Sequence, residues 1–90
     1  MSLFTIRGAL VSSGNAVIHQ YGVEFDWLEF ALEGGNRQTV TDVVAGPLVA
    51  HLVQPSVIGD FYFDRGARLL LYAIKSADGQ SAYDRGRNVA

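Results

Sequence analysis

The chain has 90 residues and a mass of 9.8 kDa, which suits one compact domain and is too short for two. Apolar residues make up 49% of the sequence and charged residues 18%, a composition that excludes intrinsic disorder. Because there is no cysteine, disulfides and thiolate metal sites are excluded, and stability must come from packing or from association. We therefore expect one small domain over residues 1–90.

The net charge of -2, with Lys75 as the only lysine, disfavours general binding to the phosphate backbone of nucleic acids. The charge is unevenly distributed along the chain. Residues 1–64 carry two basic and seven acidic side chains, a net charge of -5, whereas residues 65–90 carry five basic and two acidic ones, a net charge of +3. This asymmetry is compatible with chance, with head-to-tail self-association, or with a basic segment beside an anionic partner.

The first predicted element is a strand over residues 3–11, in which apolar and polar residues alternate. Residues 12–15 follow and include Gly14 and Asn15, which tolerate a positive φ, so a hairpin turn is predicted there. A long second strand is expected over residues 16–32. Its apolar residues change from one face to the other at Trp27 and Leu28, which predicts a β-bulge or a sharp coil at that point.

A turn at residues 34–36 precedes a third strand over residues 37–45, which is rich in threonine and valine. Gly46 and Pro47 end this strand. A short helix is then predicted near residues 47–53, because four apolar residues recur there at a helical spacing. These residues are Leu48, Val49, Leu52 and Val53.

The rest of the chain has the pattern of a hairpin with one additional strand. Strands are predicted over residues 57–64 and 67–76, joined by a turn at residues 64–66. The dipeptide at Asp78 and Gly79 is the strongest hairpin signal in the sequence, and it leads into a short last strand over residues 80–84.

This order, a three-stranded meander, a short helix and then a β-hairpin, resembles that of the OB fold, a five-stranded Greek-key barrel. The sequence therefore predicts an all-β fold with a small OB-like barrel of five to six strands. An SH3-like barrel and an open β-sandwich are the alternatives.

No group of residues supports catalysis or a cofactor, so a protein that is not an enzyme is expected. His19 and His51 are isolated and lack the spacing of metal ligands, and whether they meet in space stays open. The carboxylates of Asp60 and Asp64 alternate with core residues and are interpreted as the polar face of a strand. No serine lies in a nucleophile motif, and no glycine-rich loop has the following lysine of a phosphate site.

One candidate binding site combines aromatic and basic residues on neighbouring predicted strands, as single-strand nucleic-acid binders do. It consists of Tyr62, Arg65, Arg68 and Tyr72. The overall negative charge makes an oligonucleotide ligand the alternative hypothesis and not the leading one.

The leading hypothesis is a module that binds a protein partner, most simply a second copy of itself. A chain this short buries only about 60–65% of its unfolded surface, so some apolar area stays outside the core. The predicted strands over residues 37–45 and 80–84 are candidates for sheet edges to which a partner strand could add.

The first residues contain no basic segment before an apolar stretch, so no secretory signal is predicted and a cytoplasmic location is expected by default. No apolar stretch approaches the length of about 20 residues that a membrane span needs. The basic tail with Arg85 and Arg87 leaves a further alternative, in which these residues are the soluble part of a longer, membrane-associated protein.

Overall fold

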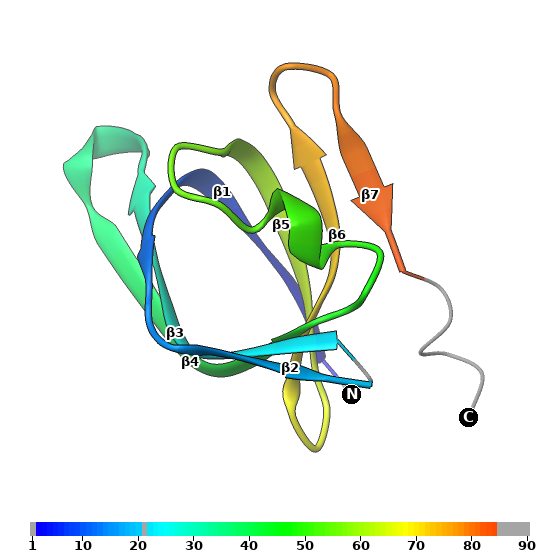
Figure 1. The fold of residues 1–90 in the computed structure, drawn as a ribbon. Coiled ribbons are helices and arrows are strands. Elements are labelled where there is room, and N and C mark those ends of the chain that lie inside the picture. Colours follow the sequence, from blue (N-terminus) through cyan, green and yellow to red (C-terminus); the bar gives the residue numbers. More distant parts are fainter. Residues whose placement is uncertain (1, 21, 85–90) are drawn as a thin grey trace.

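The computed structural model describes residues 2–20 and 22–84, so the basic tail around Arg85 and Arg87 lies outside the described residues. The described part is built almost entirely from β-strands, joined by turns (Figure 1). In chain order the strands are β1 (Ser2–Ser13), β2 (Ala16–His19), β3 (Gly22–Leu32), β4 (Arg37–Ala45), β5 (Ile58–Arg65), β6 (Leu69–Ser76) and β7 (Ser81–Tyr83).

Five of these strands close into a barrel in the order β1-β5-β6-β4-β3, and β3 pairs with β1 to complete the ring. All neighbours in the ring are antiparallel except β4 and β6, which are parallel. This is the Greek-key order of an OB-like barrel, so the predicted fold class is confirmed over the SH3-like barrel and the open sandwich. The remaining strands lie outside the ring, with β2 paired to β3 and β7 paired to β6.

The predicted hairpin turn at residues 12–15 is wrong. Strands β1 and β2 run in the same direction along β3, with Ser13 opposite Leu28 and Ala16 opposite Phe25. The two strands therefore form one long line beside β3, interrupted by two residues.

The chain reverses between β2 and β3, where His19 lies opposite Gly22. The glycine at position 14 has a different role from the predicted one, because it makes room for an aromatic ring. A Cβ atom added to Gly14 would lie 2.6 Å from the indole nitrogen of Trp27, closer than any real contact. A residue that looks like a turn signal in the sequence thus allows close packing within an extended segment.

The predicted change of face in the second strand is confirmed. Residues three positions apart on a regular strand point to opposite faces. Phe25 and Leu28 on β3 are nevertheless both buried, and so are Val40 and Val43 on β4. The ladder between β3 and β4 keeps one register through this point, so neither strand contains an extra residue there. Asp42 has a φ of 54° at the point where β4 changes face. Register shifts lie elsewhere, between residues 10 and 12 of β1 in its ladder with β3 and between residues 62 and 63 of β5 in its ladder with β6.

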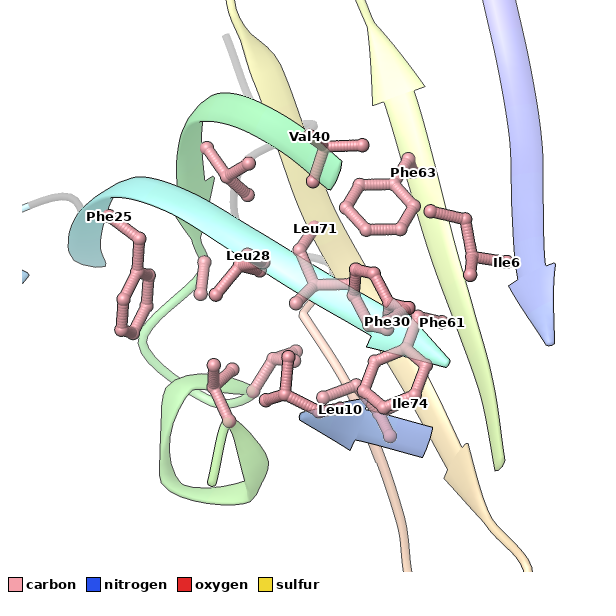
Figure 2. Close-up of a cluster of buried hydrophobic side chains, with 14 of the residues drawn as sticks. Ile6, Leu10, Phe25, Leu28, Phe30, Val40, Phe61, Phe63, Leu71 and Ile74 are labelled. Carbon is pink, nitrogen blue, oxygen red and sulfur yellow. The ribbon is translucent and has the colours of Figure 1, made fainter. Parts of the chain in front are cut away.

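The interior of the barrel is filled by one cluster of apolar side chains (Figure 2). The ring centroids of Phe30 and Phe61 are 4.8 Å apart, and Phe63 lies 6.2 Å from Phe30 in an edge-on arrangement. Ile6 from β1 and Leu71 from β6 contact the same cluster from other sides. Alternation along β5 directs its phenylalanines inward, which confirms that Asp60, Tyr62 and Asp64 belong to the outer face.

The connection between β4 and β5 contains a single 3₁₀ turn, Ala50–Leu52, in place of the predicted short helix. Val49, Leu52 and Val53 are buried and cover one end of the barrel, as the spacing predicts. Leu48 is not buried with them and is 60% exposed, because the segment forms one turn and not a continuous helix.

The two predicted sheet edges have different outcomes. Strand β4 is not an edge, because it lies between β3 and β6 and Val40 is buried. The parallel contact with β6 that closes the barrel is long-range and leaves no local signal in the sequence. Within residues 2–20 and 22–84, strand β7 pairs only with β6 and is an edge, as predicted, and the turn before it contains Asp78 and Gly79 with the glycine at a φ of 97°.

Candidate functional site

The most exposed apolar segment of the described chain is β2, the strand that continues β1 beyond the barrel (Figure 1). All four of its residues are exposed, including Val17 at 51% and Ile18 at 84%. Ile18 lies opposite Val23, which packs against the core. Because opposite residues of a ladder share a face, Ile18 extends the core-facing side of the sheet into solvent.

The backbone of β2 is free on the side away from β3, since β3 is its only neighbour within the described residues. His19 and Gly22 lie opposite each other with only two residues between them, so this pair closes the hairpin and exchanges both of its main-chain hydrogen bonds. Alternation along an antiparallel strand then turns Val17 toward β3 as well. Ala16 and Ile18 direct their N–H and C=O groups outward.

Other free edges of the sheet are less open. Residues 2–7 of β1 pair only with β5, and Leu3 there is 63% exposed, but Ile6 is buried and Phe4 is covered by the guanidinium of Arg65, 5.4 Å from its ring centroid. Strand β7 has only three residues. Its Tyr83 ring packs against Tyr72 with 6.0 Å between the centroids. Each of these edges exposes one large hydrophobic side chain, Leu3 or Tyr83, whereas β2 exposes two in succession, Val17 and Ile18.

An ion-pair cluster fastens the β2–β3 hairpin to the loop between β5 and β6. His19 Nε2 lies 2.8 Å from Glu24 Oε1, and the guanidinium of Arg68 donates to the other carboxylate oxygen of Glu24. The hydrogen bond from Arg68 and then the one with His19 hold the pKa of Glu24 below its ordinary value. Residues 44 positions apart in the chain are thus held together at one end of the barrel.

A groove of about 570 Å³ adjoins this cluster. It lies between the β2–β3 hairpin and the β5–β6 loop, and the strands and loops that line it correspond to the ligand-binding side of OB-like barrels. Its lining includes four charged or titratable side chains and three apolar ones. They are His19, Glu24, Asp64 and Arg68 with Val44, Ala67 and Leu70.

The four residues predicted as a binding site separate into two groups. Tyr62 and Tyr72 come together on the outer face, with 6.4 Å between their ring centroids and 49° between their planes. The arginines have other partners: Arg65 lies over Phe4, and Arg68 is bound to Glu24. Because the tyrosine rings are tilted against each other, they do not present one flat stacking surface.

A third tyrosine, Tyr83, packs against Tyr72, so that Tyr62, Tyr72 and Tyr83 form a tyrosine row. Tyr83 was not singled out from the sequence. Only its place on a strand beside Tyr72 brings it there. Tyr62 donates a 3.5 Å hydrogen bond to Asp60, which also accepts one from Arg7 at 2.8 Å. Carboxylates beside the row make it a poor surface for an anionic ligand.

The two histidines line different grooves, His19 beside Arg68 and His51 beside Pro55. Among residues 2–20 and 22–84, no three histidine or acidic side chains are grouped as a metal would require. Nor does that part of the chain contain a helix of the length and apolar character needed to cross a membrane.

The sequence prediction missed β2 as a surface because it assigned Val17 and Ile18 to the middle of a long strand. One signal could have identified it. A strand over residues 16–32 would have 17 residues, well beyond the usual range of about 3–10. A reversal within that stretch, at the glycine of position 22, was therefore to be expected.

Comparison with protein-family models, with curated proteins and with solved structures found no significant match.

Proposed function

We propose that this protein is a non-enzymatic interaction module that binds an extended protein segment by adding it as a strand beside β2. The observation that supports this most is the exposure of Ile18, an apolar side chain that is 84% exposed on an edge strand. Strand addition supplies main-chain hydrogen bonds for affinity and side-chain contacts for specificity.

The composition of β2 favours this role. Proteins usually protect an exposed edge with lysine, proline or a bulge, to prevent unwanted pairing. The residues from Ala16 to Ile18 contain none of these and carry no charge. A strand left both apolar and unprotected is typical of a surface that has a partner.

Binding of an oligonucleotide is the weaker candidate function. The groove beside Arg68 has the position expected for such a ligand in an OB-like barrel. However, Glu24 neutralises Arg68, and the tyrosine row is bordered by Asp60. An oligonucleotide that bound here would do so weakly and lose affinity as the salt concentration rises.

The proposal can be tested with short peptides selected from a random display library on the wild-type protein. Their affinities are measured by fluorescence anisotropy for the wild type, for Ile18→Lys and for Leu48→Lys. Leu48 is a matched control, because it is a similarly apolar side chain, 60% exposed, away from the edge. We expect Ile18→Lys to weaken binding at least about tenfold and Leu48→Lys to leave it unchanged.

Peptides that bind Ile18→Lys as tightly as the wild type would contradict the proposal. So would a library that yields no binder dependent on Ile18.

A further inference from the structure

The outward side of β2 has a repeating pattern of polar groups that a second antiparallel strand would complete. Ala16 and Ile18 each direct one N–H and one C=O away from β3, because His19 in the closing pair directs its own groups toward β3 and the direction alternates along the strand. Any strand that pairs here must have two residues, two positions apart, whose N–H and C=O groups both point toward β2.

A second copy of β2 has this pattern. We infer that two molecules pair through β2 about a two-fold axis at Val17, which makes the partner in the proposed function a second copy of this chain. In this register Ala16 lies opposite Ile18 of the partner subunit, and Val17 lies opposite Val17 of the partner subunit. Four main-chain hydrogen bonds form, and none of the hydrogen bonds between β2 and β3 is lost.

The side chains are compatible with this arrangement on both faces of the sheet. On the face that carries Ile18, the Ala16 and Ile18 side chains of the two copies form one apolar patch. On the other face the two Val17 side chains meet. The only titratable side chain of the strand, His19, lies opposite Asn15 of the partner subunit, so no like charges are opposed.

The size of the contact sets the strength of the dimer. A strand of four residues is much smaller than the 20–30 residues that each side of a stable interface usually contributes. The dimer is therefore weak and depends on protein concentration. Because the pairing is isologous it closes at two copies, and the free edge is used up.

The register can be tested with two variants that change the same positions. In Ala16→Lys/Ile18→Lys, each new lysine lies opposite a lysine of the partner subunit, which opposes pairing. In Ala16→Glu/Ile18→Lys, each lysine lies opposite a glutamate, so pairing is retained. Both variants lose the same exposed apolar side chains, and circular dichroism checks that both remain folded.

Sedimentation equilibrium of the full chain, from about 10 μM to about 1 mM, measures the mass of each protein. We expect dimers of the wild type and of the glutamate–lysine variant. The dimer of the dilysine variant is expected to be at least about tenfold weaker than that of the glutamate–lysine variant. A wild type that stays monomeric over this range would overturn the inference, and so would two variants that dimerise equally.

Failure of this inference is distinguishable from failure of the proposed function. If the wild type is monomeric while selected peptides still bind in an Ile18-dependent manner, strand addition stands and its partner is another protein. If peptide binding is also independent of Ile18, strand addition at β2 is wrong as well.

Discussion

The two short strands outside the barrel, β2 and β7, are covered to different extents. Strand β7 contributes to the fold, because Ala82 packs against the core and Tyr83 packs against Tyr72. Strand β2 contributes no side chain to the core, although it contains Val17 and Ile18. Although Tyr83 is 49% exposed, the contacts of β7 give it a structural role. An edge strand that leaves apolar side chains exposed, as β2 does, has surface available for a partner.

The largest expected effect contrasts the barrel core with β2. Phe61 is fully buried against Phe30, so Phe61→Ala leaves a cavity and is expected to lower the free energy of unfolding by about 3–5 kcal/mol. Ile18→Ala removes an exposed side chain and is expected to change it by no more than about 0.5 kcal/mol. Urea unfolding of both variants measures this difference. A loss of more than 1 kcal/mol for Ile18→Ala would show that β2 is part of the core after all.

A smaller effect is expected at the start of β3, where the chain reverses. Gly22 has a φ of 139°, and an added Cβ would lie 2.1 Å from the carbonyl oxygen of Ala45. Gly22→Ala is therefore expected to lower the free energy of unfolding by about 1–3 kcal/mol. Gly34 has a φ of 86°, but a Cβ added to it would meet no atom within 4 Å. We therefore expect Gly34→Ala to lower the free energy of unfolding by only about 1 kcal/mol. Thermal unfolding compares the two, and equal losses would contradict the steric argument.

The smallest effect concerns pH and the ion-pair cluster that fastens the β2–β3 hairpin. Contacts with Arg68 and His19 lower the pKa of Glu24 in the folded state. The stabilisation is thus present above the ordinary glutamate value of about 4.3 and is lost as the pH falls through the lowered pKa. We expect the amide exchange rates of the β2–β3 hairpin, corrected for their intrinsic pH dependence, to increase as the pH falls below about 4.3. In Glu24→Gln the corrected rate should already be raised at neutral pH and respond less to acid.

The sequence predicted the strands well because their side chains alternate, and alternation reports which face of a strand is buried. Phe61 and Phe63 on β5 show this directly, since their spacing alone assigns them to the interior. Turns were less predictable, because a glycine has several uses. Gly79 forms the expected hairpin turn, whereas Gly14 only makes room for Trp27.

Features that depend on contacts distant in sequence were not predictable. The pairing of β4 with β6 joins segments more than 20 residues apart, and it turned a predicted edge strand into an interior one. The contact between Glu24 and Arg68 is similar, because only the closed barrel brings the two side chains together. Of the four residues predicted as a binding site, only Tyr62 and Tyr72 lie side by side for a reason visible in the sequence, their places on consecutive strands.

The most direct test of the role of β2 is the solvent exchange rate of its individual amides, measured by NMR as the protein concentration is raised. The outward N–H groups of Ala16 and Ile18 should exchange more slowly at high concentration, because a second copy then accepts hydrogen bonds from them. The N–H of Val17, which already faces β3, should change little and serves as the internal control. Rates at Ala16 and Ile18 that do not change with concentration would contradict pairing between copies through this edge.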